Sequence, residues 1–173
     1  MKKMNLKNHI RNIPDFPKAG ILFKDITTLL KNKKAFKYAV DTLSAKFKDK
    51  RIDLVVAVEA RGFILGGAIA HKLGAGFVPV RKKGKLPAAT NSVTYDLEYG
   101  SDTLEMHHDA INPGEKVLIV DDLLATGGTV KAVTDLVKQI QGKIAGIVFL
   151  IELKDLKGID KLKDYPVFSL IKY

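Results

Sequence analysis

Two adjacent acidic residues, Asp121 and Asp122, follow an apolar run in the segment VLIVDDLLATGGT. Because like charges repel, the pair requires a cation or hydrogen-bond donors nearby. Carboxylates accept hydrogen bonds from vicinal hydroxyl groups, as on a ribose, and hold a divalent cation directly or through water. The pair therefore indicates a site for a hydroxylated or metal-associated ligand, with two solvent-facing acids after a strand as the alternative.

The residues after the acidic pair are typical of a phosphate-binding loop. Glycines allow a tight turn, threonines supply hydroxyl groups, and a helix predicted to begin there offers unpaired N–H groups at the positive end of its dipole. The loop consists of Ala125, Thr126, Gly127, Gly128 and Thr129. An ordinary helix N-cap turn has a similar composition. A phosphate site one turn away from hydroxyl acceptors nevertheless suits a ribose 5-phosphate group.

Basic residues follow two other apolar runs. Arg61 lies in EARG, directly after LVVAV, and the segment RKKGK at 81–85 follows FVPV. Arginine and lysine in these positions can bind a second phosphate group. The alternative for each is a solvated surface charge.

The elements between these segments predict one α/β domain with a parallel sheet flanked by helices. Apolar runs of strand length alternate with segments whose apolar residues recur every three or four positions. Strands are predicted at 54–58, 77–80, 116–120 and 144–153, and helices at about 5–13, 35–47, 62–74 and 127–141. Ligands bind outside the carboxyl ends of such strands, so the acidic pair, the loop and the basic segments should converge on one cleft.

The remaining segments predict loops and a ribbon. Prolines and a glycine between 14 and 20 indicate an ordered loop that leads to an extended piece. Because proline cannot donate a backbone hydrogen bond, Pro79 is expected near the end of its strand or in an edge strand. A loop is predicted from Arg81 to about Thr90, and alternation at 92–100 and 102–108 indicates a two-stranded ribbon outside the main sheet. Gly74 is predicted to cap the helix that precedes the second strand.

Composition limits the classes of function. The chain has 173 residues, 46% of them apolar, which suits a single domain. No apolar stretch has the length of a membrane span, and polar residues stand where a signal peptide would be apolar, so a cytoplasmic protein without a membrane partner is expected. The absence of cysteine excludes thiol chemistry. A net charge of +10 indicates an anionic partner, and the lysines between 31 and 50 fit a solvated helix face better than a nucleic-acid surface.

The motifs together resemble those of a known family. VLIVDDLLATGGT is similar to the phosphoribosyl-pyrophosphate motif of the type I phosphoribosyltransferases. IPDFPKAGILFKDIT, EARGF, VPVRKKGKLP and YDLEYG are similar, in order and spacing, to the adenine phosphoribosyltransferase branch, over nearly the whole chain. The resemblance implies a single domain over 1–173, with a small N-terminal base-binding hood over about 1–33 and a flexible β-ribbon flap over about 81–108.

The resemblance also implies an enzyme activity. Adenine and 5-phosphoribosyl 1-pyrophosphate would give AMP and pyrophosphate, a reaction of purine salvage. Mg²⁺ would be the cofactor, held by the substrate with no direct protein ligand, and any contact with Asp121 or Asp122 would pass through water. A homodimer is implied as well, because a basic loop residue of such enzymes can reach the neighbouring subunit's site. No nucleic-acid partner is expected.

Individual roles follow from the same resemblance. Asp121 and Asp122 would hold the ribose hydroxyls, and residues 125–129 the 5-phosphate. The pyrophosphate would be bound by Arg61, Lys82 and Lys85, with Arg81 assisting. Adenine would lie against Leu22, Phe23, Lys24, Leu123 and Leu153, although plain core packing is the alternative for each leucine.

Glu98 resembles the acid of the family's flap and would handle a proton on the adenine ring. Glu98 and Arg61 would be the two catalytic residues. Glu98 also alternates with apolar neighbours, so a solvent-facing position on a ribbon strand is the alternative.

Two other functions remain open at this point. A close variant would use another purine base, such as hypoxanthine, guanine or xanthine. A non-catalytic regulator could instead sense phosphoribosyl pyrophosphate and bind nucleic acid through its positive charge. Such regulators usually carry an added DNA-binding segment, and no helix-turn-helix pattern precedes the core here.

Overall fold

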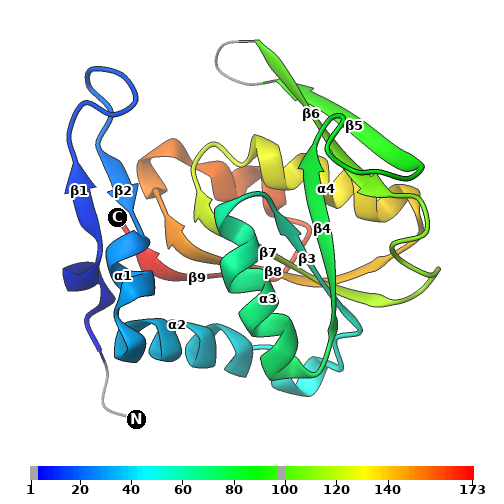
Figure 1. Cartoon of the computed structure of the whole chain (residues 1–173), viewed down its shortest axis with the longest axis horizontal. Helices are drawn as coiled ribbons and strands as arrows, with labels where there is room; N and C mark the ends of the chain where they lie inside the picture. Colours follow the sequence, from blue (N-terminus) through cyan, green and yellow to red (C-terminus); the bar gives the residue numbers. More distant parts are fainter. Residues whose placement is uncertain (1–3, 97–99) are drawn as a thin grey trace.

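A seven-stranded mixed sheet forms the centre of the protein (Figure 1). The computed structural model describes residues 4–96 and 100–173. The strand order is β5-β6-β4-β3-β7-β8-β9. The parallel strands are β3 (Leu54–Val58), β4 (Gly76–Lys82), β7 (Lys116–Leu124), β8 (Lys143–Glu152) and β9 (Val167–Lys172), and the antiparallel ones are β5 (Thr90–Asp96) and β6 (Ser101–His107).

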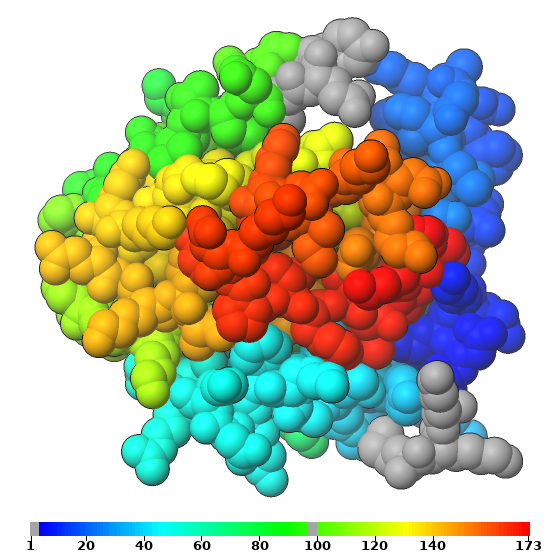
Figure 2. Space-filling view, turned by 180° about the vertical axis from the view of Figure 1, so that it is seen from behind, coloured from blue at the N-terminus to red at the C-terminus, as the bar shows by residue number. Residues whose placement is uncertain are grey.

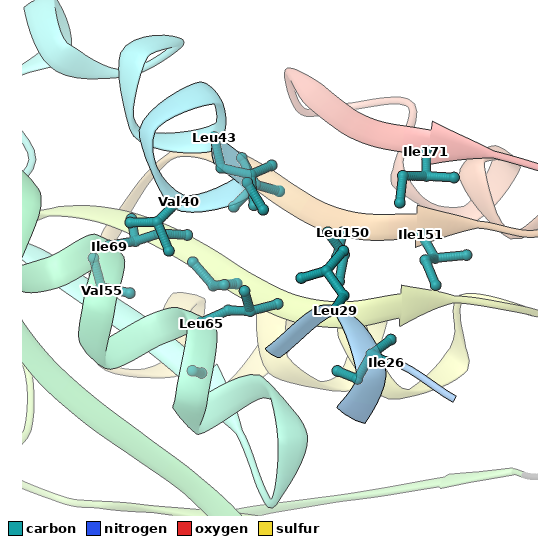
Figure 3. Close-up of a cluster of buried hydrophobic side chains, with 14 of the residues drawn as sticks. Ile26, Leu29, Val40, Leu43, Val55, Leu65, Ile69, Leu150, Ile151 and Ile171 are labelled. Carbon is teal, nitrogen blue, oxygen red and sulfur yellow. The ribbon is translucent and has the colours of Figure 1, made fainter. Parts of the chain in front are cut away.

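Helices cover both faces of this sheet. One face packs against α2 (Lys33–Ala45) and α3 (Arg61–Leu73), and the other against α4 (Gly128–Gln139). Successive strand residues point to opposite faces, so Val55 contributes to the first core and Val56 to the second. Figure 3 shows the first core, where Leu43, Leu65 and other aliphatic side chains meet. Burial on both faces explains why the central strands are continuous apolar runs.

The remaining elements are short and lie around the sheet. A second sheet pairs β1 (Arg11–Ile13) with β2 (Phe23–Asp25) in an antiparallel hairpin, here called the N-terminal hairpin. It lies on the opposite side of the molecule from the β5–β6 ribbon (Figure 1). The other short elements are η1 (Leu6–His9), α1 (Thr27–Lys31), η2 (Lys48–Lys50), η3 (Lys154–Leu156) and η4 (Gly158–Leu162).

Local signals mark the ends of the longer helices, and the predicted cap at Gly74 is confirmed. The side chain of Asn32 accepts hydrogen bonds from the N–H groups of Lys34 and Ala35, at 3.1 and 3.0 Å, and so caps α2. Gly74 ends α3 with a φ of 67°, the left-handed conformation that glycine adopts at low cost. Pro79 lies in the middle of β4, but the ribbon pairs only with Arg81 and Lys82, so the outer side of β4 is unpaired at the proline.

Several local predictions were wrong. The helix expected at about 5–13 is instead η1 followed by β1, because β1 is set by pairing with the distant β2. The ribbon does not lie outside the main sheet, since β6 pairs with β4 through Arg81 and Lys82, which therefore belong to a strand and not to a loop. The strand predicted at 116–120 continues to Leu124, which places both aspartates inside it. The short helix α1 and the last strand, β9, were not predicted at all.

Within the described part of the chain, no helix has both the length and the apolar character that a membrane span requires.

Candidate active site

A cleft of about 400 Å³ opens at the carboxyl ends of β3, β4 and β7. We call it the strand-end cleft. The parallel strands place the segments after LVVAV, FVPV and VLIV at one edge of the sheet, as the sequence pattern predicted. The lining residues are Val58, Glu59, Ala60, Arg61, Lys82, Tyr95, Asp102, Leu104, Asp121, Asp122, Leu123, Leu124, Ala125, Thr126, Gly127, Thr129 and Val130.

The acidic pair lies on the floor of the strand-end cleft, and its compensating cation is Arg61. A guanidinium nitrogen of Arg61 is 3.0 Å from Oδ2 of Asp122, whose side chain is only 8% exposed. Oδ1 of Asp121 accepts a hydrogen bond of 2.8 Å from the N–H of Asp122. Among the described residues no group donates a hydrogen bond to the buried Oδ2 of Asp122, because the Arg61 contact is an ion pair without hydrogen-bond geometry. The charge of Oδ2 is therefore compensated by the Arg61 ion pair alone among the contacts of the described residues.

Burial disfavours the charged form of both acids. Burial, reinforced by the neighbouring charge of Asp122, raises the pKa of Asp121 well above its ordinary value. Burial also raises the pKa of Asp122, and the nearby Arg61 guanidinium opposes that shift. A pair of this kind gains most from a ligand that supplies hydrogen-bond donors or positive charge.

The first turn of α3 packs unusually close to the acidic pair. A Cβ atom at Gly62 would lie 2.9 Å from Oδ1 of Asp121 and 3.4 Å from the carbonyl oxygen of Val120. Glycine in EARG therefore allows α3 to approach β7, and that approach places Arg61 over the cleft. The Arg61 guanidinium also lies 5.0 Å from the centre of the Phe23 ring, a cation–π contact that connects the cleft with the N-terminal hairpin.

The loop from Ala125 to Thr129 joins β7 to α4 with the geometry of an anion site. Gly127 is the N-cap of α4, with a φ of 79° that favours glycine. Within the described residues no side chain caps the start of α4, so its first N–H groups face the cleft at the positive end of the helix dipole. The hydroxyl of Thr129 donates to the Tyr95 hydroxyl at 3.4 Å, which brings the ribbon over the loop.

The basic residues at the rim are each paired with a carboxylate. Lys82 lines the cleft and lies 2.8 Å from Oδ2 of Asp102, an ion pair that raises the pKa of Lys82 and lowers that of Asp102. Arg81 and Lys85 lie outside the lining, at 3.1 and 3.8 Å from Oε2 of Glu59. Burial would raise the pKa of Glu59, but its hydrogen bonds from the Lys82 N–H and from Arg81 hold it below the ordinary value.

The residues predicted for adenine are spread over a wider area. Leu123 lines the strand-end cleft, whereas Leu153 is half-buried against the first core. Leu22 is 49% exposed on the N-terminal hairpin. Lys24 is buried there, with its Nζ 2.9 Å from Oδ1 of Asn12 and 4.0 Å from the centre of the Tyr173 ring. Burial, together with Lys7, lowers the pKa of Lys24.

An ion pair between the exposed Arg11 and the buried Asp25 holds the N-terminal hairpin in place. Nε of Arg11 on β1 lies 2.9 Å from Oδ2 of Asp25 on β2, and the N–H of Thr27 donates to Oδ1 at 2.8 Å. Hydrogen bonds from Thr27, and then from Arg11, lower the pKa of Asp25 to about 2. Phe23 is thus carried on a hairpin with its own polar anchor.

Comparison with known proteins identifies the family. The family model described as "Phosphoribosyl transferase domain" matches residues 26–172. The chain belongs to this phosphoribosyl transferase family. It is 62% identical, over 98% of its length and 99% of the relative's, to the adenine phosphoribosyltransferase of Clostridium kluyveri.

Solved structures of the family agree with this assignment. The adenine phosphoribosyltransferase of Thermoanaerobacter pseudethanolicus superposes with a TM-score of 0.94 at 54% identity, covering 97% of this chain and 98% of that one. The Saccharomyces cerevisiae enzyme, in complex with an imino-altritol bisphosphate and adenine, superposes with a TM-score of 0.90 at 43% identity, covering 95% and 96%. The predicted family and the predicted α/β fold, a sheet flanked by helices, are confirmed.

The phosphoribosyl transferase fold thus brings most of the predicted phosphate and ribose residues into one cleft. Arg61, Lys82, Asp121, Asp122 and the loop line it, except for Gly128, and Arg81 and Lys85 stand at the rim. Glu98 lies outside the described residues. Tyr95 and Asp102 are polar lining residues of the ribbon that sequence reasoning missed, because strand alternation marks which face a side chain takes but not that the ribbon folds over the loop.

Proposed function

We propose that this chain transfers the phosphoribosyl group of 5-phosphoribosyl 1-pyrophosphate to adenine, giving AMP and pyrophosphate. The observation that carries this proposal is the meeting of the acidic pair, the uncapped start of α4 and the two cations Arg61 and Lys82 in the strand-end cleft. The choice of adenine is supported by the relatives, since the Clostridium kluyveri and Thermoanaerobacter pseudethanolicus proteins are both adenine phosphoribosyltransferases.

The charges in the cleft suit the charges of this reaction. As the bond from the anomeric carbon to pyrophosphate breaks, positive charge develops on the sugar and negative charge on the leaving group. Arg61 and Lys82 would stabilise the leaving pyrophosphate, and Asp121 and Asp122 would accept the ribose hydroxyls beside the developing positive charge. Because Arg61 and Lys82 are paired with Asp122 and Asp102 in the free protein, binding would exchange the carboxylate partner of each cation for phosphate oxygens.

The cleft also fits a magnesium ion carried by the substrate. Within the described residues no group of three or more His, Asp or Glu side chains forms a metal cage. The carboxylates of Asp121 and Asp122, which line the cleft, are hard oxygen donors that suit a water-bridged Mg²⁺. Bound there, Mg²⁺ would neutralise charge on the pyrophosphate.

The proposal assigns the adenine ring to the space between Leu123 and the N-terminal hairpin. Arg61 spans that space, with Asp122 on one side and Phe23 on the other. The hairpin would act as the base-binding hood, the β5–β6 ribbon as the flap, and Glu98 as the acid that handles the adenine proton. Purine salvage of this kind would take place in the cytoplasm.

A direct assay tests the proposed function. Purified protein with Mg²⁺, adenine and 5-phosphoribosyl 1-pyrophosphate is expected to form AMP, which is detected by chromatography. Hypoxanthine, guanine or xanthine should compete with adenine only weakly. A preferred base other than adenine would move the assignment to a related transferase. Tight DNA binding that weakens steeply with salt, without any AMP, would favour the regulator.

We also propose a homodimer that uses the outer face of α3 and β4. Ile64 on α3 is 46% exposed and Phe77 on β4 is 38% exposed, and the Phe77 ring packs edge-to-face on Phe63 at 5.7 Å. Exposed apolar side chains gathered in this way are typical of an interface. The same strand ends in Arg81 and Lys82, so a partner docked there would lie near the basic rim.

Replacing Ile64 by lysine should therefore shift the protein toward a monomer, because a charge would be buried in the interface. Light scattering coupled to gel filtration measures the mass. Leu156→Lys is the matched control, since Leu156 is 45% exposed in η3 and away from α3 and β4. A dimer that withstands Ile64→Lys would contradict this interface.

A further inference from the structure

The loop of Ala125 to Thr129, here called the phosphate loop, packs on its inner side against the connection between β8 and β9. Residues 153–163, which join β8 to β9 and contain η3 and η4, pass directly behind the loop of Ala125 to Thr129. Figure 2 shows this segment, in orange, against the yellow part of the chain that includes α4. Their contact is between two backbones, without an intervening side chain.

Gly158 is the point of closest approach. A Cβ atom there would lie 2.8 Å from the amide nitrogen of Gly127 and 3.0 Å from the carbonyl carbon of Ala125, and it would overlap the Ala125 carbonyl oxygen. In the reverse direction, a Cβ at Gly127 would lie 3.1 Å from the carbonyl carbon of Gly158 and would overlap its oxygen. Each glycine therefore leaves the space that the other backbone occupies.

The requirement at Gly158 is for space and not for an unusual backbone conformation. Gly127 has a positive φ of 79°, and in the turn before η4 the left-handed residue is Lys157, with a φ of 50°. Gly158 is not among the residues with a positive φ. Alanine could thus adopt the backbone of Gly158, and its methyl group would act only through the phosphate loop.

The segment is anchored firmly enough to serve as a support. Leu162, at the end of η4, is fully buried in the second core with Val130 and Val133 of α4. The N–H of Lys154 donates to the carbonyl of Tyr173 at 2.9 Å, and the N–H of Asp160 to that of Lys157 at 3.0 Å. Because these anchors lie on both sides of Gly158, pressure from a methyl group would displace the phosphate loop more readily than the segment.

We propose that Gly158 is a positioning residue that holds the backbone of the phosphate loop in its binding geometry. This inference rests on the proposed function only in taking the loop as the site of the 5-phosphate. Backbone N–H groups bind an anion well when they are aligned before it arrives, and small displacements of such groups are costly.

The test compares two crowded glycines. Gly158→Ala should raise the dissociation constant for ribose 5-phosphate, measured by calorimetry, about tenfold, with a similar rise in KM for 5-phosphoribosyl 1-pyrophosphate. The dissociation constant for pyrophosphate, which binds at the opposite side of the cleft, should change by less than about twofold. Gly142→Ala is the control, because a Cβ there would press on Val137 at 2.7 Å, at the far end of α4.

Melting temperature separates a positioning role from a structural one. Gly142→Ala should lower the melting temperature without weakening the binding of ribose 5-phosphate or of pyrophosphate. The proposal is overturned if Gly158→Ala melts lower but binds ribose 5-phosphate normally, or if it weakens ribose 5-phosphate and pyrophosphate equally. A wild-type protein that binds ribose 5-phosphate but forms no AMP would contradict the proposed function. The role of Gly158 would still be decided by how Gly158→Ala changes the dissociation constant for ribose 5-phosphate relative to that for pyrophosphate.

A measurement on the wild-type protein covers the case in which Gly158→Ala does not fold. Ribose 5-phosphate should slow amide hydrogen exchange in a peptide covering 154–163, because a loop fixed by the ligand would fix the segment behind it. Protection confined to the loop itself would overturn the proposal.

Discussion

Replacing Arg61 by glutamine is expected to lower kcat/KM for 5-phosphoribosyl 1-pyrophosphate by about 10³-fold, the upper range for losing one preorganised group in a closed site. Glutamine keeps much of the side-chain length and removes the charge that would stabilise the leaving pyrophosphate. The kcat/KM of Arg61→Lys should lie between those of the wild type and Arg61→Gln, because an ammonium restores the charge but not the planar fork of donors.

Arg61→Gln should also destabilise the protein. Arg61 is the cation that faces the buried Asp122 at 3.0 Å, and its own side chain is 36% exposed. Loss of the pair would leave a buried carboxylate uncompensated, at a cost discounted by that exposure to about 1 kcal/mol, or about 2 to 4 °C in melting temperature.

Steady-state kinetics and thermal melting check both effects of Arg61→Gln. Arg51→Gln is the matched control, since Arg51 is exposed beside η2. A kcat/KM of Arg61→Gln within about threefold of the wild type would show that Arg61 does not stabilise the leaving pyrophosphate.

Replacing Asp121 by asparagine is expected to lower turnover about 100-fold while leaving the protein as stable as before or more stable. Asparagine can still accept the hydrogen bond of 2.8 Å from the Asp122 N–H through its amide oxygen. It loses the charge that would bind the ribose hydroxyls, and it relieves the repulsion between two adjacent acids.

The pH dependence of stability gives this prediction a definite sign. Because burial and Asp122 raise the folded-state pKa of Asp121 above its unfolded value, the folded protein binds more protons than the unfolded one above about pH 4. The Asp121 side chain therefore costs stability as pH rises from about 4 through its folded pKa. The melting temperature of Asp121→Asn, relative to wild type, should rise across that window and be flat below it.

Melting curves from pH 4 to 8 and AMP formation at pH 7.5 measure the two effects of Asp121→Asn. Asp49→Asn, at an exposed position in η2, is the control for a lost surface charge. Parallel loss of activity and melting temperature would show that Asp121 serves the fold and not the chemistry.

The opposite stability effects expected for Arg61→Gln and Asp121→Asn have one cause. The floor of the cleft carries one half-buried acid, one buried acid and one partly exposed cation, so removing the cation worsens the imbalance and removing an acid relieves it. A substrate that brings hydroxyl donors and Mg²⁺ would satisfy the acids when it binds. The site is thus organised for a ligand at some cost to the free protein.

The central architecture could be predicted from the sequence because its signals are local. The continuous apolar run of β3, the helical spacing of α2 and the glycine that ends α3 each report the environment of neighbouring residues. The α/β rules then place loops at one edge of the sheet, and for that reason the acidic pair, the phosphate loop and Arg61 could be expected to meet.

Short elements were missed because distant partners form them. The strand β1 has three residues and exists through its pairing with β2, and β9 is a strand because it adds to the edge of β8. The three residues of β1 are too few positions for periodicity to distinguish strand from helix.

The sequence by itself determined which groups follow the buried strands: two adjacent carboxylates, a loop of glycines and threonines, and cations. Only the tertiary structure decided which of these groups face one another. It paired Arg61 with Asp122 and Lys82 with Asp102, and it set Gly158 behind the phosphate loop. The physical reason is that ion pairing and backbone contact depend on distances of a few ångströms between residues far apart in the chain, and these distances are set by packing.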